Sequence, residues 1–320
     1  MCGVAKPAIS ARFTSTWPTA RDRREGLPGV PGEFKNYRHA FHAGNYADVF
    51  KHVLLLRLLR ALQRKPKGFL YLDTHAGRGA YDLAAAAAGP ARTPEWPAGI
   101  GRLWQDAHLP PALGDYVALV REFNERRGGA GARPRFYPGS PWIAALVQRA
   151  PDRLAFWERQ AGEARVLRAE FDRWRGTAVE CGDGYGALRA ALPPRERRAL
   201  VLIDPPFEDQ GEFESILGAL DEGLGRFPSG VYAIWYPVTE RAQTERFRRT
   251  LRARLRQPLL GAELAVTADP QVRMKGCGLL VVNPPWGFAD EVQALLPELT
   301  QRLGADASAA SHWEWLVPAP

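Results

Sequence analysis

Two short stretches of the chain place an acceptor side chain, two prolines and an aromatic ring after an apolar run. VLIDPPFE occupies residues 201–208 and VVNPPWG occupies residues 281–287. An exocyclic amine on adenine is a poor nucleophile, because its lone pair is delocalised into the ring. Asp204 could accept one N–H of such an amine and the carbonyl of Pro205 the other, while Phe207 offers a flat face to the base. The first stretch therefore predicts positioning and electrostatic stabilisation of an amine that attacks a methyl group.

A plain structural interpretation of the same residues is a Pro-Pro turn that closes a strand, since the two rings fix the backbone. A second loop bears on this choice. DTHAGRG at residues 73–79 follows an apolar run, and Gly77 and Gly79 would let the backbone approach a ligand without a Cβ in the way. The expected helix start behind it offers unpaired N–H groups and a positive dipole end. The loop is not GxGxxG and is weak alone, but together with DPPF it predicts a ligand site.

The elements that must position these loops alternate along the chain. Short apolar runs predict strands at 69–73, 153–158, 177–184, 199–207, 231–238, 262–268 and 278–286, with helical patterns between most of them. This alternation predicts a parallel α/β sheet with both faces covered. A helix with apolar residues at helical spacing, ADVFKHVLLLRLLRAL, precedes the first run and stops at KPKG.

Two segments fall outside this alternation. Residues 1–35 show no helical or strand period and predict a disordered or loosely attached tail, with a transit segment or an upstream start codon as alternatives. Residues 81–135 hold an alanine run, Pro/Gly turns and short helical patterns, which indicate an inserted helical subdomain. The main domain would then comprise residues 36–80 and 136–320.

Composition narrows the environment and the partners. The net charge of +8 and the pI of 9.6 suit phosphate partners, although an arginine-rich proteome would give the same balance. Three scattered cysteines form no CxxC pair, which fits a reducing cytoplasm and argues against a zinc site or a disulfide framework. No apolar run approaches the roughly 18–20 residues that span a bilayer. His39, His42 and His52 cluster in sequence without a completing Cys or carboxylate set, so we expect no metal.

With these motifs in view, the chain resembles a known family. The stretches YRHAFHAGNYADVFKH at 37–52, FLYLDTHAGRGAYDL at 69–83, YPGSP at 137–141, VLIDPPFE and GVYAIWYPV at 230–238 carry the resemblance. They are similar to those of bacterial 23S ribosomal-RNA adenine-N6 methyltransferases of the RlmJ type. The resemblance runs from about Tyr37 to the C-terminus and implies a Rossmann-like class I methyltransferase sheet, mostly parallel with one antiparallel strand. It also implies S-adenosylmethionine as cofactor and ribosomal RNA of the large subunit as partner. We expect a monomer.

The resemblance assigns roles to matching residues. It implies catalytic roles for Asp204, Pro205 and Phe207, where the family also has tyrosine at the last position. It implies cofactor contacts from the acid at the second strand end and from a set of motif residues: His52, His75, Gly77, Ser140, Glu158, Asp183, Gly184 and Asp204. It implies a position near the substrate base for Tyr37. We also expect RNA contacts from Lys51, Phe207 and the loop residues Arg273 and Lys275, since the sheet topology places that loop on the reactive edge. Tyr46 stands where the family can have histidine.

The acid that would bind the ribose has two candidates. Glu95 lies near the distance of about 20 residues from the glycine loop that nucleotide-binding units favour. The residues around it, GPARTPEWP, contain no apolar run that would predict a strand. Glu158 ends the run RLAFWE, which becomes the second strand if 81–135 is an insertion. The strand-end rule favours Glu158.

Topology chooses between the two proline motifs. Ligands of open α/β sheets bind at the carboxyl ends of parallel strands, and in the folds that the chain resembles ALVLID lies beside the first strand. GLLVVNPP follows AELAVTA through a loop short enough for a hairpin, so it would run antiparallel and carry Asn283 to the far edge. IDPPFE is therefore predicted to be the active copy, unless Asn283 lies near the cofactor site. The final HWEWLV run could form an additional strand, so the order of the strands in the sheet stays open.

Three other functions stay open. DPPF also occurs in methyltransferases that act on guanine N2 of ribosomal RNA, and both acceptors have a free exocyclic amine. A non-catalytic RNA-binding module on the same scaffold is a further alternative, although the intact DTHAGRG and DPPF loops argue against it. Protein-glutamine methyltransferases have an NPPY pattern, which Asp204 does not match.

Overall fold

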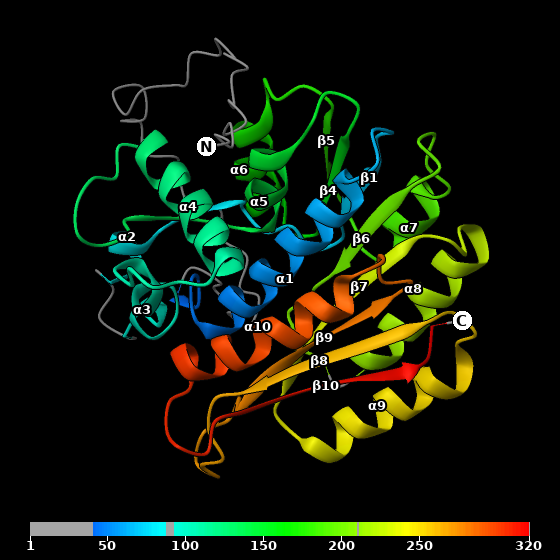
Figure 1. Ribbon diagram of the computed structural model, residues 1–320. Helices are drawn as coiled ribbons and strands as arrows, with labels where there is room; N and C mark the ends of the chain where they lie inside the picture. Colours follow the sequence, from blue (N-terminus) through cyan, green and yellow to red (C-terminus); the bar gives the residue numbers. More distant parts are fainter. Residues whose placement is uncertain (1–40, 88–92, 210, 320) are drawn as a thin grey trace, which may run out of the picture. The chain divides into compact units, whose positions relative to one another are not determined.

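An eight-stranded sheet carries the apolar runs of the chain (Figure 1). The structure is a computed structural model, and it describes residues 41–87, 93–209 and 211–319. The predicted tail at 1–35 lies outside the described residues. The strands in chain order are β1 (Leu70–Asp73), β4 (Arg153–Glu158), β5 (Thr177–Cys181), β6 (Ala199–Ile203), β7 (Val231–Val238), β8 (Leu259–Ala265), β9 (Gly276–Val282) and β10 (Ala310–Val317). Across the sheet they follow the order β10-β8-β9-β7-β6-β1-β4-β5.

Most of the sheet is parallel. β1 pairs in parallel with β4 on one side and β6 on the other, with Leu70 opposite both Arg153 and Ala199. β5 extends the sheet beyond β4, and β7 extends it beyond β6, again in parallel. Strand order reverses at β1, because β4, the next strand of this sheet along the chain, lies on one side of β1 and β6 lies on the other. A crevice at the carboxyl end of β1 is the place where such sheets bind ligands.

The last strands run in both directions. β9 is antiparallel to β7 and β8, which confirms the predicted antiparallel strand and the hairpin. β10, which contains HWEWLV, is antiparallel to β8 and adds a second reversed strand at the edge of the sheet. HWEWLV is thus the extra strand whose place in the sheet was open. At the end of β9, the Asn283 amide donates hydrogen bonds of 2.9 and 2.8 Å to the carbonyls of Pro228 and Gly230, just before β7 begins. Asn283 therefore lies at the amino edge of the sheet, as predicted.

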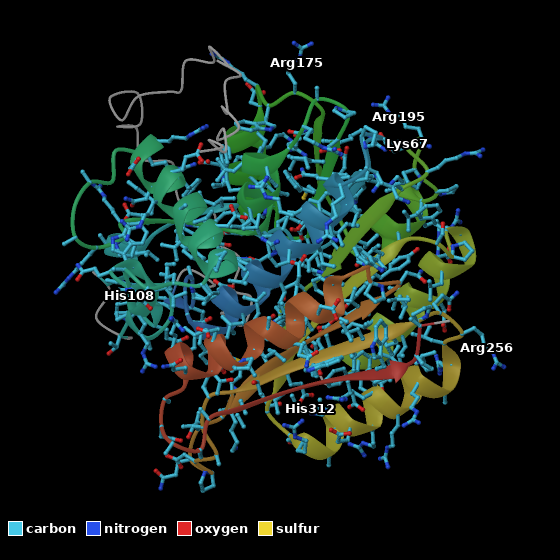
Figure 2. The ribbon with its side chains drawn as sticks, in the orientation of Figure 1. Lys67, His108, Arg175, Arg195, Arg256 and His312 are labelled. Atoms are coloured by element: carbon cyan, nitrogen blue, oxygen red, sulfur yellow. The ribbon has the colours of Figure 1, made fainter. Side chains whose placement is uncertain are left out.

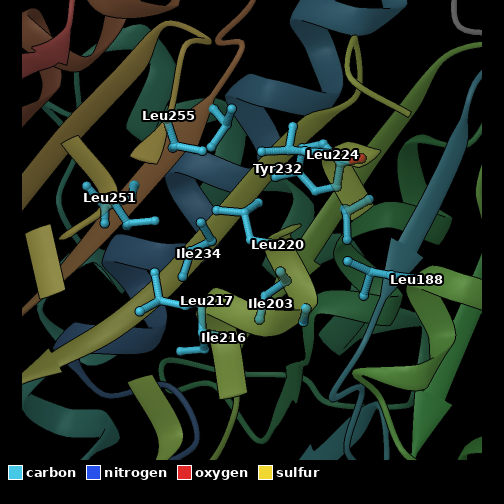
Figure 3. Packing of buried hydrophobic residues seen from close by; sticks show 14 of the residues in the cluster. Leu188, Ile203, Ile216, Leu217, Leu220, Leu224, Tyr232, Ile234, Leu251 and Leu255 are labelled. Atoms are coloured by element: carbon cyan, nitrogen blue, oxygen red, sulfur yellow. The ribbon is translucent and has the colours of Figure 1, made fainter. Parts of the chain in front are cut away.

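Helices cover both faces of the sheet, since β1, β6 and β9 are buried along their whole length. On one face α7 (Gly186–Ala191), α8 (Glu212–Arg226) and α9 (Arg241–Arg254) pack on the central strands in a single apolar cluster (Figure 3). α1 (Tyr46–Gln63) contacts both α5 (Ser140–Val147) and α10 (Phe288–Leu303) (Figure 1), and α6 (Ala161–Phe171) contacts β4 and β5.

The segment predicted as an insertion is mainly helical. It contains α2 (Leu83–Ala87), the short 3₁₀ helix η3 (Trp96–Ala98), α3 (Ile100–Trp104) and α4 (Pro111–Arg126). These helices lie between β2 (Ala80–Asp82) and β3 (Phe136–Pro138), which pair antiparallel as a separate two-stranded sheet. That this segment is a subdomain of its own stays a prediction.

The start of α1 has a reciprocal cap that fixes the entry of the chain into the helix. The Asn45 side chain accepts a 2.9 Å bond from the N–H of Asp48, and the Asp48 carboxylate accepts from the N–H of Gly44 at 3.0 Å. The helix is apolar on nearly every side and buried, although it carries Lys51 and His52 in its first half. No helix among the described residues is long and apolar enough to cross a membrane.

Candidate active site

The loops after β1 and β6 lie side by side at the carboxyl edge of the sheet. The backbone N–H and the hydroxyl of Thr74 both donate to the carbonyl of Leu202, at 3.1 and 3.0 Å. This joins DTHAGRG to the residues that lead into Asp204. β1 and β6 are parallel with Asp73 opposite Leu202, so Asp73 ends β1 and Asp204 follows β6 at the same edge of the sheet. The two motifs are thus brought together as predicted.

The glycine loop closes on the end of β4. Gly77 has a positive φ of 60°, which favours glycine, and its N–H donates a 2.9 Å bond to Glu158 Oε2. The other carboxylate oxygen of Glu158 accepts from the N–H of Gln160 at 2.7 Å. Burial raises the pKa of Glu158. Glu158 is therefore the acid at the second strand end, whereas Glu95 lies at the start of η3 and binds the Asn45 side chain at 2.9 Å.

The turn after β5 approaches the same loop. A Cβ at Gly184 would lie 1.9 Å from the carbonyl oxygen of Thr74, so only glycine lets the two loops come this close. Asp183 accepts from the backbone N–H groups of Tyr185 and Gly186 at 3.3 and 3.1 Å. The His75 ring meets the Tyr185 ring edge-on, with 5.0 Å between centroids. Burial lowers the pKa of His75 to about 4, so this imidazole is neutral at pH 7.

Ser140 enters the site from the start of α5. The N–H of Gly139 donates to the carbonyl of Gly79 at 2.8 Å, which fixes the helix start against the glycine loop. Ser140 is buried and hydrogen-bonded to the Asp73 carboxylate, which also accepts from the Tyr71 hydroxyl at 2.9 Å. Burial, which outweighs these hydrogen bonds, raises the pKa of Asp73 to about 6.

Asp204 faces a buried ammonium. Lys51 on α1 donates to Asp204 Oδ2 at 2.6 Å and lies 3.0 Å from an Asp48 oxygen. The three side chains are 6%, 14% and 4% exposed in that order, so the group is largely shielded from water. Burial by itself lowers the pKa of Lys51, but the two carboxylates overcome it and raise the pKa well above its usual value. Lys51 is therefore a charged partner of Asp204 and not a side chain on an open surface.

The rest of the DPPF turn presents an aromatic face. Pro205 is buried, and Phe207 has a positive φ of 50°, uncommon for a non-glycine residue. The Phe207 ring lies edge-on to Phe213 and Trp235, at centroid distances of 5.2 and 5.9 Å. Lys51 Nζ lies 5.6 Å from the Trp235 ring centroid. Residues in such sparsely populated backbone conformations cluster at active sites and ligand-binding sites.

Other predicted site residues lie further away or outside the described chain. His52 is 1% exposed, and its Nδ1 lies 2.9 Å from the Tyr137 hydroxyl, so its described contacts are those of packing between α1 and β3. Its role in cofactor binding stays a prediction. Arg273 and Lys275 lie in the loop between β8 and β9, on the carboxyl edge, where Lys275 donates to the carbonyl of Val272 at 3.0 Å. Tyr37 lies outside the described residues.

Four residues of the site had no predicted role. Asp48 is the second partner of Lys51, and Asp73 is the hydrogen-bond partner of Ser140. The Tyr185 ring lies beside His75, and the Trp235 ring lies beside Phe207. All four lie in or directly beside the motif stretches, but their contacts join elements that are distant in the chain. Within the described ranges, no group of three or more His, Cys, Asp or Glu side chains could hold a metal ion. The absence of a metal from the reaction stays a prediction.

The arrangement suits a cofactor with ribose hydroxyls, an adenine and a positive charge. Carboxylates at the ends of β1, β4, β5 and β6 converge on one glycine loop, and hydrogen-bond acceptors dominate the side chains there. Such a set can accept from hydroxyl and amino groups and attract a cation. The residues present therefore fit S-adenosylmethionine.

Comparison with known proteins agrees with this geometry. The family model described as "Ribosomal RNA large subunit methyltransferase D, RlmJ" matches residues 66–317. The chain is 41% identical over 284 residues to a Haemophilus influenzae protein named ribosomal RNA large subunit methyltransferase J, covering 88% of this chain and 99% of that protein. The Escherichia coli protein of the same name is 42% identical over the same coverage. A crystal structure from Legionella pneumophila superimposes with a TM-score of 0.77 at 35% identity, covering 86% of this chain and 98% of that one.

Proposed function

The chain belongs to the family described as ribosomal RNA large subunit methyltransferase D, RlmJ, and we propose that it methylates the exocyclic N6 of an adenine in 23S ribosomal RNA. The observation that carries this proposal is the position of Asp204. It follows β6 directly, lies across from the glycine loop after β1, and keeps a buried cationic partner at 2.6 Å.

We assign the cofactor to the crevice around β1. Glu158 would accept from the ribose hydroxyls, and Asp183 with Gly184 would lie along the adenine of the cofactor. Gly77, His75, Ser140 and His52 complete the proposed set. S-adenosylmethionine, when bound there, supplies an electrophilic methyl group on a positively charged sulfur. The nearby Asp73 and Asp204 carboxylates would favour that charge electrostatically.

The amine would be held by the DPPF turn. Phe207 would stack on the target base, and the Pro205 carbonyl would accept one N–H of the amino group. Asp204 Oδ2 is engaged by Lys51, while Oδ1 has no hydrogen bond among the described residues and could accept the second N–H. The nitrogen lone pair then points out of the ring plane, away from both acceptors. Asp204 would balance the positive charge that develops on nitrogen as its bond to carbon forms.

Lys51 would fix the geometry of Asp204 by a charge-assisted hydrogen bond. Since the pair is shielded from water, its orientation is more rigid than that of an exposed carboxylate. We propose that the enzyme acts as a monomer in the cytoplasm and needs no metal, because attack on a sulfonium methyl group requires none.

The experiment that tests the proposal compares two amide variants from the same loop. Asp204→Asn removes the charge at the reacting edge, and Asp209→Asn removes an exposed charge five residues later. Calorimetry with S-adenosylmethionine should show that both variants still bind the cofactor, with a much smaller loss of affinity in Asp204→Asn than its loss of methyl transfer. Transfer of tritiated methyl groups to unmodified ribosomal RNA should fall at least a hundredfold in Asp204→Asn only. Wild-type activity of Asp204→Asn would refute the role of Asp204.

A further inference from the structure

The two edges of the sheet carry opposite charge. The carboxyl edge holds the candidate site. The amino edge is formed by the loops at residues 64–69, 148–152, 172–176, 192–198, 227–230, 255–258 and 283–287. These loops contain ten Lys and Arg side chains and three acids: Arg64, Lys65, Lys67, Arg149, Arg173, Arg175, Arg195, Arg197, Arg198 and Arg256 against Asp152, Asp172 and Glu196. The amino edge is therefore strongly basic.

The carboxyl edge shows the reverse balance. Its loops at residues 74–79, 159–160, 182–185, 204–209, 239–240, 266–275 and 304–309 hold four cations and seven acids. The acids are Asp183, Asp204, Glu208, Asp209, Glu240, Asp269 and Asp306, and the cations are Arg78, Arg159, Arg273 and Lys275. This balance suits a cationic cofactor, but it repels the phosphates of an RNA that must reach the same edge.

Hydrogen bonds join the amino-edge loops into one surface. Arg149 Nη1 donates to the carbonyl of Lys65, and Arg198 donates to the carbonyl of Lys67. The Gln148 side chain reaches the carbonyl of Arg175 at 3.2 Å. The guanidinium groups of Arg149 and Arg198 thus hold the loops together through backbone carbonyls. The side chains of Lys65, Lys67 and Arg175 take no part in these bonds.

Arg64 and Arg195 form ion pairs with Glu291 and Glu196, but four other cations of this edge project outward without a carboxylate partner among the described residues. Lys65, Lys67, Arg175 and Arg256 are exposed, and none has an ion pair among the described residues. Figure 2 shows Lys67, Arg175 and Arg256 reaching away from the ribbon along the upper and right-hand margins. Unpaired and exposed cations are the groups that release counterions when they meet phosphates.

An aromatic ring stands on the same edge. Trp286, in the NPPW turn after β9, is 90% exposed, whereas the other exposed large apolar side chains of the described residues, Val166 and Val272, are 36% and 37% exposed. Arg64 donates to the carbonyl of Trp286 at 3.0 Å, which holds the turn against the end of α1. A solvent-facing indole on a turn that a cation holds in place offers a flat face on which an unpaired base can stack.

We propose that the amino edge is a second contact surface for the RNA, with cations for its phosphates and Trp286 as a stacking platform for an unpaired base. The proposal rests on the proposed function and extends it from the target base to the flanking RNA. A five-residue strand such as β6 separates the edges by about 17 Å, twice the Debye length of about 8 Å at physiological salt. The basic edge can thus bind phosphates without neutralising the acidic one. The VVNPPWG motif would then serve binding, at the edge opposite to catalysis.

The test compares two quadruple charge-removal variants. Lys65, Lys67, Arg175 and Arg256 are replaced by Gln in the edge variant. Arg165, Arg246, Arg249 and Arg252, which are exposed on α6 and α9 and have no carboxylate partner among the described residues, are replaced by Gln in the control. Binding of unmodified 23S ribosomal RNA is measured over a series of salt concentrations, and methylation gives kcat and KM.

For the edge variant we expect the slope of log K against log salt to fall by about 3, since each phosphate contact contributes roughly 0.7–0.9. KM for RNA should rise at least tenfold while kcat stays within twofold of wild type. Equal losses in the control variant, or a wild-type slope and KM in the edge variant, would overturn the assignment. If the wild type itself methylates no ribosomal RNA, the proposed function fails independently of this surface.

Trp286 gives a separate readout at constant charge. Trp286→Ala should weaken RNA binding roughly fivefold or more, and Trp286→Phe should recover most of the loss, because stacking needs only a flat ring. The salt dependence should be unchanged in both. Equal affinity of the wild type and Trp286→Ala would remove the stacking platform from the proposal.

Discussion

The ammonium of Lys51 donates a 2.6 Å hydrogen bond to Asp204, across a separation of 153 residues in the chain. The contact places the first helix directly behind the turn that follows β6. It also leaves only one carboxylate oxygen of Asp204 for a substrate. Packing of α1 thus determines how the DPPF turn presents its acceptors, and the pair can be tested through folding as well as activity.

Removal of the cation should be costly, because it leaves two largely buried carboxylates without the positive charge that both of them contact. We expect Lys51→Met to lower the free energy of unfolding by about 3 kcal/mol. In an Asp204→Asn background the same change should cost at least about 1 kcal/mol less, since the two residues interact directly. Urea unfolding of the wild type, the two single variants and the double variant completes this double-mutant cycle. Additive losses would contradict a direct energetic link.

The two candidate acids predict different effects on the cofactor. Glu158→Gln should weaken binding of S-adenosylmethionine roughly ten- to hundredfold, because a carboxylate binds hydroxyl donors more tightly than an amide. Glu95→Gln, which changes an acid held by Asn45 and His42, should bind with wild-type affinity. Calorimetry on both variants decides the matter. A loss confined to Glu95→Gln would show that Glu158 has been assigned wrongly.

Phe207 should act through the flat face of its ring, so a hydroxyl added to that ring should change activity little. Phe207→Tyr should keep kcat/KM within about threefold of wild type, while Phe207→Ala should lose roughly tenfold or more as the stacking face disappears. Cofactor affinity should be equal in all three proteins. Equal activity of Phe207→Ala and the wild type would place the base elsewhere.

Asp73 predicts a pH dependence of stability. Burial raises its pKa to about 6 in the folded protein, from 3.8 in the unfolded chain, so the folded state binds the proton more tightly. The stabilising effect is complete below pH 4 and is lost as pH rises through 6, by about 3 kcal/mol. Asp73→Asn should lack this loss. The free energy of unfolding in urea is measured for the wild type and Asp73→Asn between pH 4 and 7, and the difference between the two proteins is compared across this range. A difference that does not change with pH would exclude the effect.

Much of the fold followed from local pattern. The apolar runs predicted the sheet strands, and the short link between AELAVTA and GLLVVNPP predicted the antiparallel return that separates Asn283 from Asp204. Strand-end position also distinguished Glu158 from Glu95, since an acid at the end of a parallel strand must lie at the carboxyl edge. β2 and β3 escaped prediction, because three-residue strands carry no readable alternation.

The interior of the site could not be predicted in the same way. The buried contacts of Lys51 with Asp48 and Asp204 were not predicted, and its expected contact with RNA stays a prediction. A lysine at helical spacing gives no sign of the distant carboxylate that it meets. The contact between His52 and Tyr137 was not predicted either. These contacts depend on how α1 lies against the sheet, which only tertiary packing determines.

The most direct test of the central claim is the identity of the methylated nucleoside. Unmodified 23S ribosomal RNA is incubated with the protein and isotopically labelled S-adenosylmethionine, digested to nucleosides and separated by mass-resolved chromatography. The proposed function predicts label in N6-methyladenosine only, and none with Asp204→Asn. Label in N2-methylguanosine, or no label in any nucleoside of the RNA, would contradict it.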